Sequence, residues 1–329
     1  MDQREIVQLL EYQRLIESYE FAYSTYLYTV LLLSTILTTA VLYLFFYRES
    51  RLNKELYCIY LHAILSCYGV IVATCLWQLV ILPPSIGGYA CDMSPFAFLG
   101  TDGFFFALWI IWALSAHLGV AYTLGFFIQT YRLKLSEPID FIRSLVQWFE
   151  ESKNTKTFLN GSLFFHCLLT AIPLVNIRMN LFNIDEYPAL VAMHKRHPSM
   201  VLITKNNIIL NFSIAVCAVI VLVEILFCIK SNWVTFRSVQ STSDIVTSKT
   251  FQSQMHMYRL SSIQLLMNIV FYFIPVAITA SQMLGFLDMK YLGTINICAM
   301  VILCPAQSLG CIDWIPEITI KTSRLIFRR

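Results

Sequence analysis

Seven stretches of this chain contain no Asp, Glu, Lys or Arg, and each is at least 18 residues long. A helix needs about 20 apolar residues to cross the hydrocarbon core of a bilayer, because each residue adds about 1.5 Å along the axis. The runs are too long and continuous for the strands of a membrane barrel, which alternate over about ten residues each. They cover 21–47, 56–91, 103–131, 157–177, 206–223, 260–287 and 291–312.

Composition also predicts a chain embedded in the lipid bilayer. Hydrophobic residues make up 57% and charged residues 13% of the 329 positions, whereas soluble proteins carry about 25% charged residues. The net charge of +3 gives no reason to expect a nucleic-acid partner. No linker or repeat divides the chain, so we predict one all-α domain, residues 1–329, forming a seven-transmembrane helix bundle. The predicted spans are about 23–47, 57–82, 103–130, 157–177, 207–229, 260–284 and 291–314.

The distribution of Lys and Arg predicts the orientation of these spans. With the N-terminus outside, the outer segments hold seven basic residues and the inner segments hold sixteen. Cytosolic loops of membrane proteins carry the excess of basic residues, so we expect the N-terminus outside and the C-terminus inside. We expect a multi-pass protein of the plasma membrane.

Three segments outside the spans have informative patterns. Residues 1–20 space apolar side chains as an amphipathic helix does, leading into the first span. Residues 136–150 predict a second amphipathic helix, because Ser136 can cap it and Pro138 suits its first turn. Residues 231–258 are rich in Ser, Thr and Gln, which predicts a flexible polar loop.

Cysteine and histidine positions give no sign of a metal or cofactor site. Nine of the ten cysteines fall in or against spans, and Cys91 lies in a predicted outer loop, where Cys75 can reach it only if that residue is near the outer surface. His194 and His197 are three residues apart but have no further ligands in sequence. No spaced His box, GxSxG or nucleotide loop occurs, so we expect neither an enzyme nor a cofactor.

Proline residues and one acid interrupt the later spans. Pro275 and Pro305 predict either static kinks or hinges in spans six and seven. Glu224 lies in span five near its inner end, where a carboxylate is costly unless it is paired. We expect it to pair with Lys230, Arg259 or Arg132, as a fixed structural pair or as a lock that opens.

Polar side chains in the other spans allow two interpretations. Asp102 opens span three at the outer face, where it is either solvated or directed into an outer cavity. The histidines are expected to form hydrogen bonds between helices rather than to act as ligands or proton relays: His62, His117 and His166. The amides are expected to join helices, with some facing a pocket: Gln78, Asn207, Asn211, Gln282 and Asn296.

Several local motifs resemble the nematode serpentine chemoreceptors, a seven-helix G-protein-coupled receptor superfamily, and classes H and I in particular. These are LPPSIGGYACD after span two, Arg132 in QTYRLKL at the inner end of span three, and Pro275 and Pro305. The family tends to place an aromatic residue and an arginine after the last proline, where this chain has Ala306 and Gln307. The resemblance implies a receptor of sensory cilia that binds a small odorant or pheromone from outside and signals to a heterotrimeric G protein.

Position in the predicted spans selects the candidate residues for such a receptor. The candidates for ligand binding are Tyr89, Asp102, Phe105, Trp109, Asn207, Asn211, Gln282 and Tyr291. The candidates for coupling are Arg132, Glu224, Arg259, Pro275 and Pro305. The alternative functions are a ligand-gated channel of inverted topology and a small membrane transporter or accessory protein.

Overall fold

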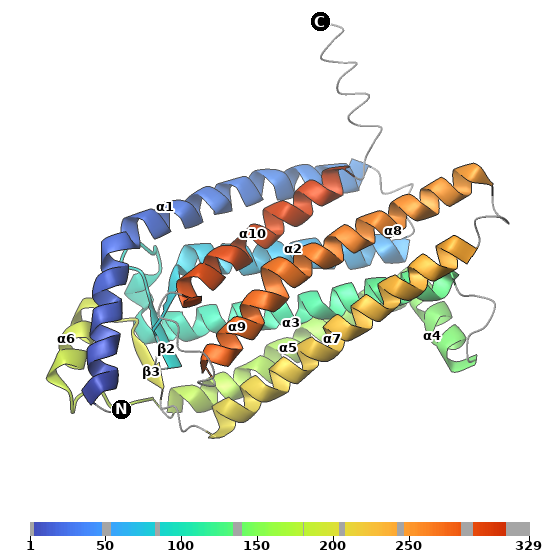
Figure 1. Cartoon of the computed structure of the whole chain (residues 1–329). Coiled ribbons are helices and arrows are strands. Elements are labelled where there is room, and N and C mark those ends of the chain that lie inside the picture. The colour runs from blue at the N-terminus through green and yellow to red at the C-terminus, as the bar shows by residue number, and fades with distance from the viewer. Residues whose placement is uncertain are drawn as a thin grey trace, which may run out of the picture.

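The structure, a computed structural model, is a bundle of long helices with a small sheet at one end (Figure 1). It describes residues 3–47, 54–82, 86–133, 140–179, 181–203, 208–241, 247–283 and 292–313. The sheet and the described N-terminal residues lie at one end of the bundle, which we call the sheet end. The short helix α4, Asp140–Glu150, lies at the opposite end, which we call the α4 end.

Long apolar helices make up most of the described chain. They are α1 (Gln3–Tyr47), α2 (Lys54–Trp77), α3 (Gly100–Leu133), α5 (Ser152–Met179), α7 (Ile208–Ser241), α8 (Ser248–Asn268), α9 (Ile274–Met283) and α10 (Leu292–Asp313). A π-helical segment, η3 (Ile269–Phe273), joins α8 directly to α9. Within the described residues, five helices are long and apolar enough to cross a membrane, and Ser262–Ile278 and Ile295–Ala306 are shorter apolar helical stretches. The chain is therefore a helical protein of the membrane-embedded class.

Helix α3 occupies the centre of the bundle and contacts α2, α5 and α7. Its buried side chains include Leu118, Ala121 and Leu124, which belong to the largest apolar cluster. Helices in a membrane associate mainly by close packing, and small residues such as Ala121 allow two helices to approach closely. Helix α1 packs along α10 and α2 and curves near the sheet end (Figure 1).

The sheet end contains structure that the sequence pattern did not predict. Helix α2 ends at Trp77 rather than at the predicted residue 82, because Gln78 has a left-handed φ of 49° and turns the chain into a strand. Three antiparallel strands follow: β1 (Leu79–Ile81), β2 (Ile86–Ala90) and β3 (Val201–Ile203), with β2 in the middle. Leu79 pairs with Ala90, and Gly87 pairs with Leu202. A 3₁₀ turn, η2 (Ala97–Leu99), and helix α6 (Pro188–Arg196) complete this end.

The predicted loop over residues 231–258 is wrong for most of its length. Helix α7 continues to Ser241 and α8 begins at Ser248. The polar residues that predicted a loop instead join helices: Thr130 of α3 lies 3.2 Å from Thr235 of α7 between hydroxyl oxygens, and Asn232 donates to Ser262 over 3.0 Å. The predicted amphipathic helix after Pro138 is present as α4, with Val146 and Phe149 buried. The predicted N-terminal helix is continuous with the first span, in α1.

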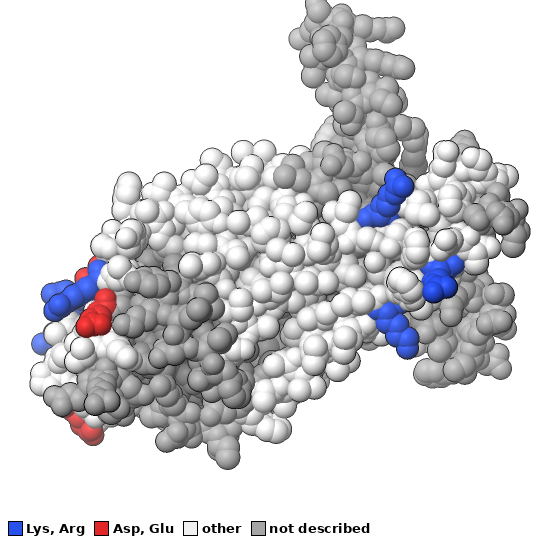
Figure 2. All heavy atoms as spheres, in the orientation of Figure 1, with Lys and Arg blue, Asp and Glu red and all other residues white. Residues whose placement is uncertain are grey.

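Charged side chains divide between the two ends of the bundle (Figure 2). Among described side chains, the α4 end holds five basic residues, Lys153, Lys156, Lys230, Arg237 and Arg259, against the two acids Glu150 and Glu151. The sheet end holds four basic residues, Arg14, Arg178, Lys195 and Arg196. Its seven acids are Glu11, Glu17, Glu20, Asp92, Asp102, Asp185 and Glu186. The α4 end is therefore the more basic end of the described chain.

Candidate functional site

Tyr89, a predicted ligand residue, is fully buried inside the sheet end. Its ring stacks on the imidazole of His197, with ring centroids 4.2 Å apart and an angle of 29° between the planes. Burial, followed by the negative charges of nearby acids, raises the pKa of the Tyr89 phenol well above its usual range. Tyr89 belongs to the core that joins the sheet to the helices.

Asp102 forms an ion pair with Arg178. Asp102 stands in the first turn of α3 and Arg178 in the last turn of α5, so each charge also faces the favourable end of its helix dipole. Both side chains are more than half exposed, and exposed pairs contribute about 0–1 kcal/mol. The carboxylate therefore lies at the surface and binds a partner within the protein.

Phe105 and Trp109, one turn apart in α3, both belong to one apolar cluster near the sheet end. Phe105 is buried in it with Phe104 and Trp77. The indole N–H of Trp109 donates to the carbonyl of Cys167 over 2.8 Å, which fixes α3 against α5. The four described ligand candidates, Tyr89 and Asp102 among them, do not line either of the cavities described below. Asn207 and Tyr291 lie outside the described residues, as do the side chains of Asn211 and Gln282.

His197 connects three segments of the sheet end and was not predicted to do so. Its Nδ1 lies 2.9 Å from Asp92 Oδ1, and its Nε2 lies 3.4 Å from Glu17 Oε1 of α1. The Gln13 amide also donates to Glu17 over 2.8 Å. No group of three or more metal-type ligands occurs within the described residues, so here the two carboxylates act as partners of the imidazole. In the sequence, the only indication of this His197 cluster is the number of acidic residues in 11–20.

Cys75 and Cys91 are both buried, and both are free thiols in the structure. Burial is the main cause that raises the pKa of the Cys91 thiol, and Glu20 raises it further. The disulfide between Cys75 and Cys91 that the sequence left open is therefore absent.

Glu224 lies near the middle of α7. Because α7 runs to Ser241, sixteen residues precede Glu224 in the helix and 17 follow it. At about 1.5 Å per residue, the carboxyl is about 24 Å from either helix end. It contacts Gly119 near the middle of α3. Its expected location near the inner rim of the membrane stays a prediction, because α7 continues past the predicted span to Ser241.

The expected pairing of Glu224 is also absent among described side chains. Lys230 and Arg259 are both exposed, and neither forms an ion pair with Glu224. Six residues correspond to about 600° of helical rotation at about 100° per residue, so Lys230 is on a different face of α7. The side chain of Arg132, at the end of α3, lies outside the described residues.

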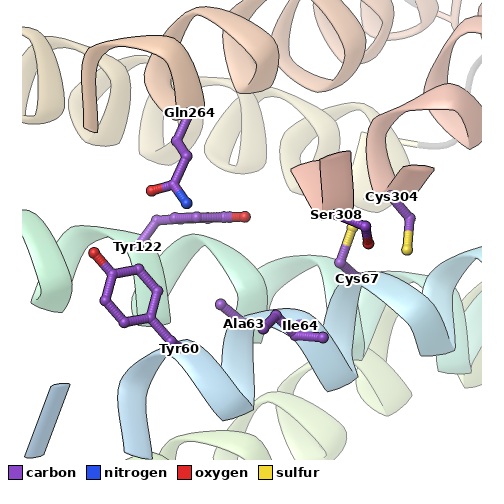
Figure 3. Close-up of a pocket in the computed structure, with 8 residues that line it drawn as sticks. All are labelled: Tyr60, Ala63, Ile64, Cys67, Tyr122, Gln264, Cys304 and Ser308. Carbon is purple, nitrogen blue, oxygen red and sulfur yellow. The ribbon is translucent and has the colours of Figure 1, made fainter. Parts of the chain in front are cut away.

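Glu224 lines a small cavity between α3, α7 and the α8–η3–α9 helix. The cavity offers about 10 Å³ to a water-sized group. Its wall combines aromatic and polar side chains, namely Tyr122, Thr123, Phe126, Cys228, Asn268, Tyr272 and Phe273. A second cavity of similar size lies between α2, α3, α8 and α10, with Tyr60, Tyr122 and Gln264 around it (Figure 3). Tyr122 lines both cavities, which places them side by side.

The helix beside the Glu224 cavity contains both a π-helical segment and a proline. Segment η3 supplies Tyr272 and Phe273, and Pro275 follows in α9. Proline removes one backbone hydrogen bond, and π segments are frequent at functional sites. Pro305 is buried in α10, one residue after Cys304, which lines the second cavity. Both predicted helix breaks therefore lie beside cavities.

The intramembrane histidines confirm one prediction and correct another. His62 of α2 and His117 of α3 are 3.0 Å apart between Nδ1 and Nε2, so they join two helices as predicted. His166 lies 2.7 Å from the carbonyl of Ser162, one turn earlier in the same helix. Its described hydrogen bonds are therefore within α5.

Comparison with known proteins adds no family assignment. No protein-family model matches the chain, and no curated protein matches it in sequence.

Proposed function

We propose that this protein is a seven-helix G-protein-coupled chemosensory receptor with its N-terminus outside the plasma membrane. A small odorant or pheromone-like molecule binds within the bundle and shifts an existing equilibrium between two helix arrangements. The shift changes the face that the α4 end presents to a heterotrimeric G protein in the cytosol.

The observation that carries this proposal is the cavity that Glu224 lines, because it adjoins the interrupted α8–η3–α9 helix. Tyr272 and Phe273 belong to the cavity wall and to the π segment just before Pro275. A group that enters the cavity therefore touches the part of the helix where a π segment and a proline interrupt the α-helical hydrogen bonding. From η3, helix α8 runs to the α4 end of the bundle. A change in the bend at η3 and Pro275 therefore moves the part of α8 that lies at the α4 end.

Two further features support the orientation and the span count. The α4 end is the more basic end among described side chains, as expected for a cytosolic face. Each of the seven predicted spans overlaps a described helix over most of its length, the sixth with the combined α8–η3–α9 helix. Arg132, near the end of α3, and the exposed Arg259 of α8 are the basic residues that we propose for contact with a cytosolic partner.

Nucleotide exchange tests this proposal. Membranes that contain the protein and a heterotrimeric G protein should show faster exchange with some members of an odorant panel. Arg132→Ala should abolish that response while surface expression stays normal. Normal signalling by this variant would remove Arg132 from the mechanism, whereas substrate-dependent uptake or ion current without exchange would favour a transporter or a channel.

A further inference from the structure

Glu224 is an acid without a described partner at the centre of a membrane helix. No hydrogen bond or ion pair to another described side chain involves its carboxyl group. An ionised carboxylate is costly at this depth unless a positive group accompanies it. The described basic side chains of α7 and α8 that were expected to fill this role, Lys230 and Arg259, are exposed elsewhere.

A glycine holds the carboxyl group of Glu224 against α3. A Cβ added at Gly119 would lie 2.6 Å from Glu224 Oε2 and 3.2 Å from Oε1, which is too close for any other residue type without a shift. The absence of a side chain at residue 119 therefore leaves the space that the carboxyl group occupies against α3. This contact directs the acid to the cavity that Thr123 and Asn268 also line.

Four aromatic side chains line the cavity, together with the apolar side chains of Leu118 and Leu265 and the thiol of Cys228. Tyr122 and Phe126 come from α3, and Tyr272 and Phe273 come from η3. Aromatic faces attract cations, and organic ammonium groups are recognised by several rings together. The volume of about 10 Å³ matches one water-sized group, which is the size of an ammonium head.

From this arrangement we propose that Glu224 is the anionic anchor of a binding site for a small protonated amine, of the ammonium or methylammonium class. The carboxylate supplies the countercharge, the aromatic rings surround the cation, and Thr123 and Asn268 supply oxygen atoms for its N–H groups. This inference rests on the proposed receptor function, because it names the chemical class of the ligand. A bound amine also contacts η3, the segment beside Pro275.

Thermal unfolding of the full chain in detergent tests the site without a G protein. Methylammonium chloride should raise the melting temperature in a saturable manner, while sodium chloride at equal ionic strength and methanol, the uncharged analogue, should not. Glu224→Gln keeps the shape and removes the charge, so its half-maximal methylammonium concentration should rise more than tenfold. Gly119→Ala keeps the acid but displaces it, and a similar rise is expected.

Gly69→Ala is the matched control. Its added Cβ would lie 2.6 Å from the Leu114 side chain, an equally close contact between helices that does not involve Glu224. It should bind methylammonium as the native chain does. If Gly119→Ala does not fold, Glu224→Gln decides alone.

Three results would overturn the inference: an equal response to sodium, an unchanged response in Glu224→Gln, or no methylammonium response in the native chain. A stability difference between the native chain and Glu224→Gln that depends only on pH would make Glu224 a proton site instead. Odorant-stimulated nucleotide exchange without amine binding would reject this inference alone. Saturable amine binding without any nucleotide exchange would reject the receptor function and leave the site.

Discussion

At the scale of single residues, the sheet end holds polar groups whose partners differ greatly. His197 has a carboxylate on each ring nitrogen, Asp92 and Glu17. The Tyr89 hydroxyl, by contrast, is buried without a hydrogen-bond partner. A buried polar atom with no partner costs about 1–3 kcal/mol, so the two stacked rings should respond in opposite ways to substitution.

Tyr89→Phe is expected to raise the free energy of unfolding by about 1 kcal/mol, because it removes the unpartnered hydroxyl and keeps the ring. The pH dependence has a defined sign. Burial raises the pKa of the Tyr89 phenol in the folded protein, whereas the unfolded phenol ionises near pH 10. Above about pH 10, ionisation of the unfolded chain therefore lowers the free energy of unfolding of the native protein. Thermal melts from pH 7 to 11 should therefore fall less steeply for Tyr89→Phe. Parallel profiles for the two proteins would contradict the assignment.

His197→Phe should destabilise the protein by about 1–3 kcal/mol, because it keeps a ring on Tyr89 but leaves Asp92 and Glu17 without their shared partner. A double-mutant cycle with Asp92→Asn, measured by thermal unfolding, separates this contact from packing. A coupling energy near zero would show that the imidazole contributes only as a ring.

The Cys91 thiol should react slowly with maleimide in the folded protein. Its pKa is raised mainly by burial, so the reactive thiolate is scarce at neutral pH and the sulfur is also covered. Mass spectrometry should find Cys91 labelled only after unfolding, and treatment with a reducing agent should not change its labelling. Rapid labelling of the native chain would mean that the sheet end opens.

At the scale of elements, hydrophobicity predicted the helices but not where they end. Residues 79–90 belong to one long charge-free run, so nothing in their charge separates the last turns of α2 from strands β1 and β2. The polar residues after Lys230 predicted a loop because the packing of Thr235 on Thr130 is not visible in sequence. The presence of the long helices was therefore predictable, whereas their ends and the short strands depended on tertiary contacts.

The sheet requires glycine at residue 88. A Cβ there would meet the carbonyl oxygen of Val80 and come within 3.2 Å of the Phe104 ring. Gly88→Ala should therefore reduce the melting temperature by several degrees and lower surface expression. Gly161→Ala is the matched control, since a Cβ at Gly161 in α5 meets nothing within 4 Å and alanine favours a helix by about 1 kcal/mol. Equal behaviour of the two variants would argue against close strand packing.

At the scale of the whole molecule, the candidate site was predicted only in part. Glu224, Pro275 and Pro305 were selected from sequence, and all three lie at or beside the two cavities. The aromatic residues of the sheet end were selected for a pocket, but Phe105 and Trp109 pack against other parts of the bundle. Gly119 and Tyr122 carried no sequence signal, because their importance comes from the registration of α3 against α7.

Topology connects every part of this account, because a receptor needs the sheet end outside and the basic α4 end in the cytosol. Epitope tags placed before Met1 and after Arg329 should be stained in intact and in permeabilised cells. Antibodies should reach only the N-terminal tag in intact cells and both tags after permeabilisation. If intact cells expose only the C-terminal tag, the charge argument and the receptor proposal both fail, and ion current should be recorded next.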